Sequence, residues 1–338
     1  MTVHGANFVV RAAVLAAVAL ALTLAGCHAG QGRDASTAAA GVALAETPPA
    51  LPRAWKEAVA RELGKPPDEV TDADLATVTE LSLVGADVAD LAPLRRLPAM
   101  RVLDLRYTQV ADLAPVGDLA ELWWLNLEGT RVADLAPLAR LRHLTKLFLT
   151  DTQVTDLSPL TGHVHLRSFS CEGTGVSDLR PLAGATGLWF LWCDNTRVAD
   201  LAPLAGMAGL RKLSARNTPV ADLTPLAHLR HLEEVHLAGT AVADLAPLGG
   251  WSRLRVLNVA RTPVADLTPL RGLRELERLD LSSTGVADLK ALATLRHLRH
   301  LDLSGTRVTT IQPLKGLPDL ETVLLHGTPA VRQVAPPR

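Results

Sequence analysis

The 338-residue chain has few aromatic residues, few cysteines and no excess of charge of either sign. Phenylalanine, tryptophan and tyrosine make up 3% of it, and 34 lysines and arginines balance 35 aspartates and glutamates. Such a balance leaves no overall basic footprint for nucleic acid. The sequence also shows no phosphate-binding loop, no GxSxG, no HExxH and no paired CxxC. It therefore predicts no catalytic function, no cofactor and no metal site.

A repeat runs from Leu81 to Leu325. One copy, Met100–Leu119, reads MxxLxLxxTxVxDLxPVxxL. An aspartate recurs from Asp90 to Asp288, and a threonine recurs every 22 residues at Thr108, Thr130, Thr152, Thr174, Thr196, Thr218, Thr240, Thr262, Thr284, Thr306 and Thr328. Periods of 20–29 residues with an LxxLxL core are the signature of a leucine-rich repeat. We predict an α/β repeat solenoid with a parallel sheet on its concave face and short 3-10 or turn segments on its convex face.

The repeated positions have separate structural roles. Leu103 and Leu105 alternate with Asp104, so a short strand points two leucines inward and one residue outward. One repeat cannot bury its apolar side alone, and stacked neighbours bury it together. Twelve such rows, ending at Val323 and Leu325, predict a sheet roughly 55 Å long at about 4.8 Å per strand.

The aspartate and threonine ladders have a functional reading, a row of calcium sites, and a structural one. We favour the structural reading, because a position fixed in every repeat usually belongs to the scaffold. The aspartate caps a short helical segment, and proline occupies the first turn of that segment. The threonine hydroxyl is expected to bond backbone groups in a buried turn.

Residues 9–25 are apolar apart from Arg11 and Thr23, and the run ends Leu24-Ala25-Gly26-Cys27. This pattern is typical of a secretory signal, and its end resembles the lipobox of bacterial lipoproteins. The resemblance implies a signal peptide at residues 1–26, cleavage before Cys27 and lipidation of that cysteine. An ordinary signal peptide or an N-terminal membrane helix are the alternatives. His28 favours the outer membrane in a bacterium with two membranes.

Three further segments surround the repeats. Residues 27–50 are rich in small and polar residues and predict a lipidated, flexible tether. Residues 51–78 predict a helical N-terminal cap, because Trp55, Val59 and Leu63 share a helical face, Gly64 ends that helix and Thr71 can begin another. The solenoid follows at residues 79–328, and residues 329–338 form a short tail.

The cap and the 22-residue repeats together resemble internalin-like bacterial proteins, from Leu51 to about Thr328. The chain departs from that family where threonine replaces the usual asparagine. It also shows neither the immunoglobulin-like module nor the C-terminal cell-wall anchor that many members carry. The resemblance implies a fold and a mode of binding, and it implies no particular ligand.

Cys171 and Cys193 lie one repeat apart, both in place of the second strand leucine. A disulfide or a metal pair is one reading. We favour two small buried apolar residues, because side chains on adjacent parallel strands point alongside each other. Four nearby positions where other repeats carry leucine are also occupied by other residues: His163, Ala185, Met207 and Ala215. These substitutions are consistent with a more loosely packed section of the core or with a modified shape of the face above it.

The outward strand positions are the candidate binding face. Aromatic residues are scarce, yet four fall on this face within four repeats, at Trp124, Phe148, Phe190 and Trp192. Exposed aromatics are enriched at interface hot spots, so we predict a ligand-binding patch of these four with Lys146, Lys212 and His236. The alternative is a cluster whose members pack on each other. Alternation turns Trp123 and Trp189 away, which ranks them lower.

The C-terminal half of the face is polar, with His236, Asn258, Asp280, His300 and Asp302. Strands about 5 Å apart hold such residues too far apart to converge on one ion. We predict a non-enzymatic protein of the bacterial envelope that binds a protein partner. The alternatives are a carbohydrate- or peptidoglycan-binding protein, with Trp124 and Trp192 stacking on sugar rings, and a structural spacer.

Overall fold

The computed structural model describes residues 50–330 of the chain. The predicted signal peptide, Cys27 and nearly all of the tether lie outside the described residues, as does most of the C-terminal tail. The described residues fall in one compact unit that begins at Ala50. None of its helices, over residues 50–330, has the length and apolar character needed to cross a membrane.

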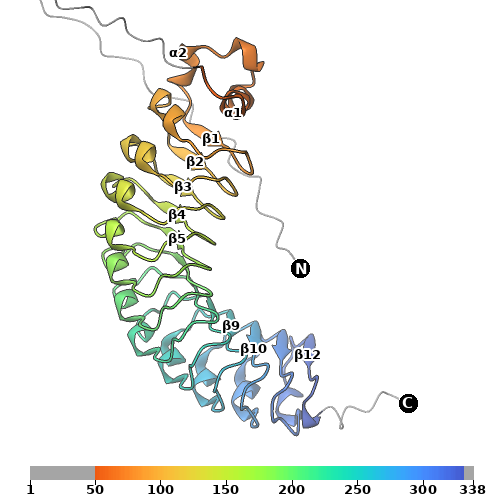
Figure 1. The fold of residues 1–338 in the computed structure, drawn as a ribbon. Helices are drawn as coiled ribbons and strands as arrows, with labels where there is room; N and C mark the ends of the chain where they lie inside the picture. Colours follow the sequence, from red (N-terminus) through yellow and green to blue (C-terminus); the bar gives the residue numbers. More distant parts are fainter. Residues whose placement is uncertain (1–49, 331–338) are drawn as a thin grey trace, which may run out of the picture. The chain divides into compact units, whose positions relative to one another are not determined.

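Within residues 50–330, twelve parallel strands form one open sheet in the order of the sequence. Each strand pairs with the next exactly one repeat later, as in the register Leu81 to Leu103. This confirms the predicted solenoid, and Figure 1 shows the strands along the inner side of the curved unit. The strands are β1 Glu80–Ser82, β2 Val102–Asp104, β3 Trp124–Asn126, β4 Lys146–Phe148, β5 Ser168–Ser170, β6 Phe190–Trp192, β7 Lys212–Ser214, β8 Glu234–His236, β9 Val256–Asn258, β10 Arg278–Asp280, β11 His300–Asp302 and β12 Thr322–Leu324.

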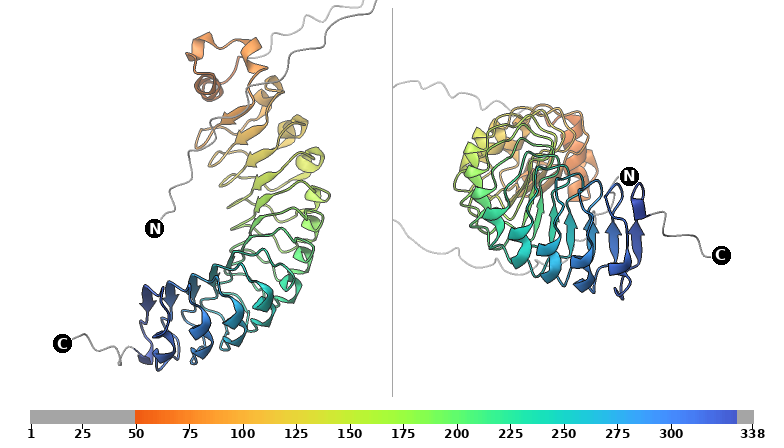
Figure 2. Two further views of the ribbon diagram at one scale, coloured as in Figure 1. Left: turned by 180° about the vertical axis from the view of Figure 1, so that it is seen from behind. Right: turned by 90° about the horizontal axis from the view of Figure 1, so that it is seen from below.

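Short 3-10 segments line the outer side of the unit, one between each pair of strands (Figure 2). Asp134 shows how the repeat forms them: its Oδ1 accepts the Ala136 N–H at 2.7 Å. The aspartate stands one residue before the N-cap position, Leu135, so it closes a turn onto the segment and is no N-cap itself. The segments are η2 Ala92–Arg96, η3 Ala114–Asp118, η4 Ala136–Arg140, η5 Ser158–Leu160, η6 Arg180–Leu182, η7 Ala202–Leu204, η8 Thr224–Leu226, η9 Ala246–Gly250, η10 Thr268–Gly272, η11 Lys290–Thr294 and η12 Gln312–Leu314.

The threonine ladder is structural, as predicted. The Thr108 hydroxyl donates to the Leu105 carbonyl oxygen at 2.7 Å, and the bond recurs at each later threonine through Thr328. These hydroxyls are buried or nearly so. A short side chain that satisfies a carbonyl inside the stack lets the turn close without an unpaired polar group.

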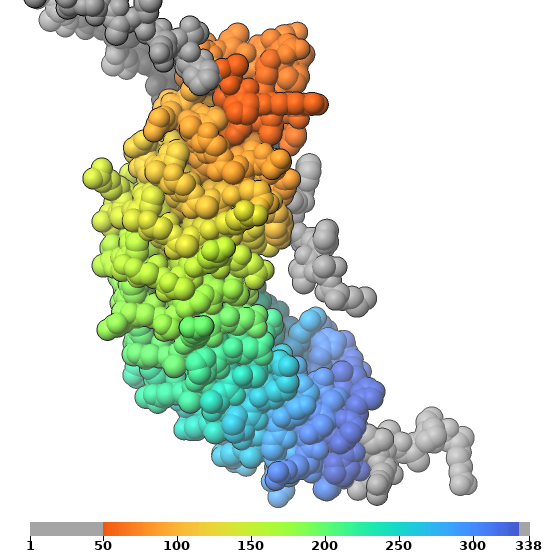
Figure 3. Space-filling model, viewed as in Figure 1, coloured from red at the N-terminus to blue at the C-terminus, as the bar shows by residue number. Residues whose placement is uncertain are grey.

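The core is a continuous column of leucine and valine between the strands and the 3-10 segments. Leu103, Leu125 and Leu147 are fully buried, the equivalent residues through Leu301 are nearly so, and Val323 of the last strand is only partly buried. The space-filling view shows the repeats packed without interruption from the cap to β12 (Figure 3). Cys171 and Cys193 are buried in this column as free cysteines, which confirms the apolar reading of the pair.

The weakened leucine positions are filled without exposing the core. His163 is buried, and its two ring nitrogens lie 3.0 Å from the Leu160 oxygen and 3.1 Å from the Leu138 oxygen. Trp251 occupies the same repeat position and donates from Nε1 to the Leu226 oxygen at 3.1 Å. Carbonyl groups of the preceding repeat therefore allow a polar ring in place of leucine.

A helical cap precedes the first strand. Helix α1, Arg53–Leu63, buries Trp55 and Val59, and Gly64 ends it in the left-handed conformation at φ 66°. The segment η1, Pro67–Glu69, leads to α2, Asp72–Leu75, where Thr71 and Asp74 form a capping box. Trp55 and Leu75 pack in the same apolar core as Leu81, so the cap covers the first row as predicted.

Candidate binding face

The aromatic residues predicted for binding lie on the concave face as two pairs. Trp124 of β3 and Phe148 of β4 meet with ring centroids 5.9 Å apart and planes tilted by 57°. Phe190 and Trp192, both of β6, stack with centroids 5.7 Å apart. All four side chains are half-buried. The structure thus brings the four together in two pairs, and part of each ring packs against its partner.

Strand β5 lies between the two pairs and carries only serines outward. Ser168 and Ser170 are buried, although they stand at outward positions. Their register neighbours are Lys146 and Phe148 on one side, and Phe190 and Trp192 on the other. The larger side chains therefore close over the small ones, which is why this part of the face is packed rather than hollow.

The two predicted lysines contact different partners. Lys212 Nζ lies 5.8 Å from the centre of the Phe190 ring and 2.6 Å from Glu234 Oε1. Lys146 Nζ lies 5.9 Å from the ring of Trp123. A cation over an aromatic ring is attracted to the ring quadrupole. Positive charge therefore borders the aromatic pairs where the strands begin.

Trp123 and Trp189 are more prominent than the alternation argument indicates. They are 38% and 47% exposed and stand immediately before β3 and β6. Arg211 lies 5.8 Å from the Trp189 ring. Because each strand has only three residues, the residue before it lies on the rim of the sheet. The short strand length could therefore have predicted that Trp123 and Trp189 are exposed.

The opposite rim, where the strands end, is acidic in the same repeats. Asp194 is buried and accepts the Ser214 hydroxyl at 2.5 Å and the Arg216 N–H at 2.7 Å. Burial, followed by the charge of Asp194, raises the pKa of Glu172 to about 7. Asp151 and Glu128 add to that rise. These residues were not predicted, since no single repeat shows that they gather.

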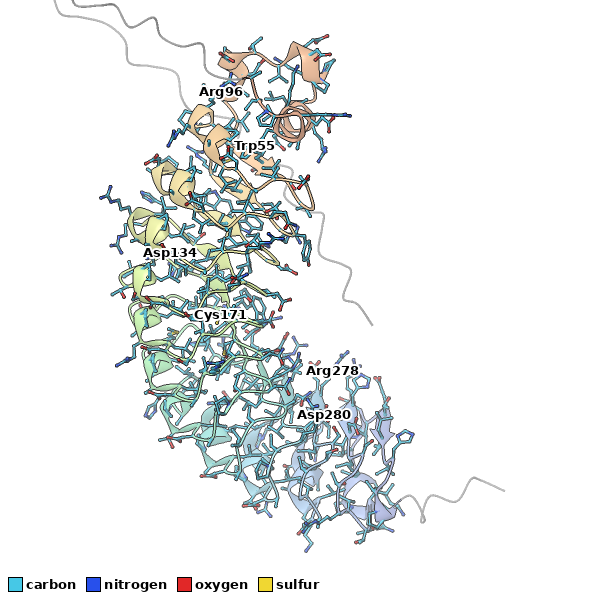
Figure 4. All side chains as sticks on the ribbon, viewed as in Figure 1. Trp55, Arg96, Asp134, Cys171, Arg278 and Asp280 are labelled. Carbon is cyan, nitrogen blue, oxygen red and sulfur yellow. The ribbon has the colours of Figure 1, made fainter. Side chains whose placement is uncertain are left out.

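A groove of about 220 Å³ lies farther along, over β8 to β12. Its polar lining includes Arg278, Asp280, His300 and Asp302, and Figure 4 shows Arg278 and Asp280 on the inner side of β10. Asp280 accepts the Asn258 amide at 3.0 Å and the Ser282 hydroxyl at 2.7 Å. The hollow part of the concave face is therefore the polar half, away from the aromatic pairs.

His236 stands between the two halves and not among the aromatic pairs. It lines the groove, and its Nδ1 is buried without a hydrogen-bond partner in residues 50–330. Burial, and then the charge of Arg216, lowers the pKa of this imidazole. Of the seven predicted binding residues, four form the aromatic pairs, Lys146 and Lys212 border these pairs, and His236 belongs to the groove.

The face offers apolar, aromatic and charged contacts to a ligand. Within the described range, no three His, Cys, Asp or Glu residues are placed to hold a metal ion. Asp280 and Asp302 accept N–H groups from their own turns, at Ser282 and Ser304. Those bonds hold both carboxylates in fixed orientations at the edge of the groove.

Comparison with known proteins places the fold. A leucine-rich repeat family matches residues 294–310. An internalin (InlF) from Listeria monocytogenes is 27% identical and aligns over 82% of both chains with a TM-score of 0.78. An internalin C2 of the same organism is 34% identical over 61% of this chain and 92% of its own, with a TM-score of 0.59. The chain belongs to the internalin-like leucine-rich repeat proteins.

More distant structures share the solenoid alone. The ectodomain of a plant receptor kinase from Arabidopsis thaliana is 16% identical and aligns over 77% of this internalin-like chain and 37% of its own, with a TM-score of 0.61. A search of the curated proteins found no match. Leucine-rich repeat solenoids commonly bind proteins, and this internalin-like chain presents the open concave face that such binding uses.

Proposed function

We propose that this internalin-like protein is a non-enzymatic, lipid-anchored protein of the bacterial envelope that binds a protein partner through the concave face from β3 to β8. The observation that carries the proposal is the pair of aromatic contacts, Trp124 with Phe148 and Phe190 with Trp192, at outward positions of the sheet. The core gives no reason for large apolar side chains there. Such residues dominate the energy of protein interfaces.

The charges beside the aromatic pairs indicate which charges the partner surface should carry. Lys146 borders them where the strands begin, and Glu172 with Asp151 borders them where the strands end. Burial raises the pKa of Glu172 first and the charge of Asp194 adds to the rise, so a basic partner group would favour the charged form of this carboxyl. The complementary partner surface has an apolar centre with basic side chains toward Glu172.

The ring geometry favours protein over carbohydrate. A sugar stacks on a flat ring face that is open to solvent, whereas Phe190 and Trp192 stack on each other and Lys212 lies over Phe190. Trp124 is tilted against Phe148. The plant receptor ectodomain, in complex with Casparian strip integrity factor 2, gives a precedent for a protein ligand at the level of the fold.

The anchor belongs to the proposal through Cys27. The run Leu24-Ala25-Gly26 before this cysteine supports processing and lipidation there. The side chain of His28 supports the outer membrane where a bacterium has two. A lipid at the start of the chain and a segment of small residues after it would present the solenoid away from the membrane surface.

The test begins with capture of a partner from envelope extracts by the full-length protein. Affinities are then measured for the double variant Trp124→Ala/Trp192→Ala and for its control, Asp280→Ala/Asp302→Ala. We expect the aromatic variant to lose roughly 2 kcal/mol or more per residue and the control to lose little. If the control alone fails, the ligand occupies the polar groove, and if an envelope polysaccharide is captured instead, carbohydrate is the ligand.

A further inference from the structure

A second hollow, of about 500 Å³, lies outside the concave face, where the 3-10 segments of two repeats lead into their strands. Its lining is Arg271, Arg274, Ala293, Thr294, Arg296 and His297. Arg271 belongs to η10, and Ala293 and Thr294 belong to η11. Arg274 and Arg296 stand one repeat apart, so the stacking of β10 on β11 brings them together.

The small residues of η11 leave the space open. Ala293 stands in the same repeat position as Arg271, and so offers no side chain to fill the hollow. The Thr294 hydroxyl donates to the Arg271 carbonyl oxygen at 2.9 Å, which holds the two segments together at the floor. The hollow is therefore shaped by the backbone of η10 and η11 and bordered by guanidinium groups. Its volume falls in the range of small-molecule sites.

The guanidinium groups of Arg271, Arg274 and Arg296 make no hydrogen bond or ion pair with any residue in the described part of the chain. Two other arginines of the same stack do. Arg255 lies 2.6 Å from Glu277, and Arg299 lies 3.4 Å from Glu321. Paired and unpaired arginines therefore occur in the same stack of repeats. The difference between them comes from the positions of the carboxylates and not from a general lack of carboxylates.

No carboxylate lines this hollow. Glu275 lines the neighbouring hollow instead, together with Arg253 and Arg255. Asp319 Oδ2 lies 3.1 Å from His297 Nδ1, so this carboxylate is already paired with the imidazole. Asp266 is held by the N–H of Thr268 at 2.8 Å, and Arg271 contributes least to the lowering of its pKa. The hollow is therefore lined by three arginines and no carboxylate, and Asp266 attracts Arg271 from outside the lining.

We infer that this hollow binds a phosphate group. A guanidinium group presents paired N–H donors that match the spacing of phosphate oxygens. Three guanidinium groups around one hollow offer more donors than the two oxygens of a carboxylate ligand could accept. The phosphate can come from a soluble phosphate ester or from a lipid headgroup. The site is separate from the concave face, so its test is independent of the protein partner.

The experiment compares three forms of the full-length protein. The triple variant Arg271→Gln/Arg274→Gln/Arg296→Gln removes the hollow's charges. Its control, Arg211→Gln/Arg255→Gln/Arg299→Gln, removes the same net charge from arginines that are ion-paired at the surface, where such pairs contribute little stability. Binding of pyrophosphate and glycerol 3-phosphate is measured by calorimetry, with chloride at matched ionic strength as the reference.

We expect the wild type and the control to bind a phosphate probe and the hollow variant to bind it roughly tenfold or more weakly. Flotation with phosphatidylcholine vesicles, with and without phosphatidylglycerol, distinguishes a lipid source. A lipid on Cys27 would act equally in all three forms. The inference is overturned if the wild type binds neither probe nor the anionic vesicles preferentially, or if the control loses as much affinity as the hollow variant.

Discussion

At the scale of single residues, Glu172 on the acidic rim of the sheet has a raised pKa. Its carboxyl is half-buried, and burial together with Asp194 raises its pKa from an ordinary 4.5 to about 7. Arg216 opposes the rise but does not cancel it. The cost of keeping this carboxylate charged in the free protein is what a basic partner residue would relieve.

That cost should appear in the pH dependence of stability. Between about pH 4.5 and 7 the folded chain holds a proton on Glu172 that the unfolded chain has released. Stability therefore falls as pH rises through this window and is lowest above it. We expect Glu172→Gln to raise the free energy of unfolding at pH 8 by on the order of 2 kcal/mol, reduced by partial exposure, and to change little at pH 4.

Urea unfolding of the wild type and of Glu172→Gln at both pH values measures the effect. Glu275→Gln is the matched control, because it makes the same change at a carboxylate that lines a different hollow. An equal gain for Glu172→Gln at pH 4 and pH 8 would show that the perturbation does not come from ionisation.

At the scale of the element, most of the 3-10 segments begin with an aspartate turn followed by proline; η11 lacks the proline, and Thr310 replaces the aspartate before η12. Asp134 Oδ1 accepts the N–H of Ala136, which begins η4, and Pro137 needs no partner for its missing N–H. The same bond begins η3 at Asp112 and η10 at Asp266. Repetition of one hydrogen bond therefore spaces the convex side evenly, and this spacing lets the strands stay in register.

We expect Asp134→Ala to lower the free energy of unfolding by roughly 0.5–1.5 kcal/mol, the usual net value of one hydrogen bond. Asp134→Asn keeps an acceptor oxygen in place and should lose less. Thermal and urea unfolding of both variants measure the difference. Equal losses in the two variants would mean that charge, rather than the hydrogen bond, is what the turn requires.

At the scale of the whole molecule, the period of the sequence determines the solenoid. Leu103 and Leu105 predict both the strand and its inward side, and a constant step of 22 residues predicts the register of all twelve strands. Buried Trp55 predicts the cap in the same way. These features depend on one residue's position within its own repeat, which is why sequence alone reaches them.

Features made by two or more repeats were harder to predict. The alternation along each strand predicts that the aromatic residues stand at outward positions, but their pairing across β3 and β4, and the closure over Ser168, depend on side-chain size in neighbouring rows. The rise in the pKa of Glu172 and the arginine hollow beside η10 depend on which carboxylates are near. The residues of one repeat do not indicate the charges that the adjacent repeat places beside them.

The proposed lipid anchor concerns the whole chain and depends on Cys27. We expect Cys27→Ala to move the protein from the membrane fraction to the soluble fraction, because one residue carries the proposed lipid. Fractionation followed by detection of the protein measures this. His28→Ala serves as the control, since it leaves the cysteine intact. A Cys27→Ala chain that is processed and still sediments with membranes would rule out the lipid anchor.

The cap should support the stability of the entire stack. Trp55 is 1% exposed and belongs to the core that contains Leu81, so the first apolar row is covered by α1. A solenoid propagates its order from neighbour to neighbour, and an uncovered terminal row exposes apolar surface. Trp55→Ala should lower the free energy of unfolding by roughly 3–5 kcal/mol, and deletion of residues 51–78 should cause aggregation.

Trp189→Ala is the matched control for the cap variant, because that tryptophan is 47% exposed and fills no space in the core. Its effect on unfolding should be small, within about 0.5 kcal/mol. Circular dichroism during thermal unfolding follows the stack, and light scattering follows aggregation. If Trp55→Ala melts in two steps, the cap unfolds by itself while the repeats persist. If the truncated chain stays monomeric with an unchanged melting temperature, the first row needs no cover and the capping role is wrong.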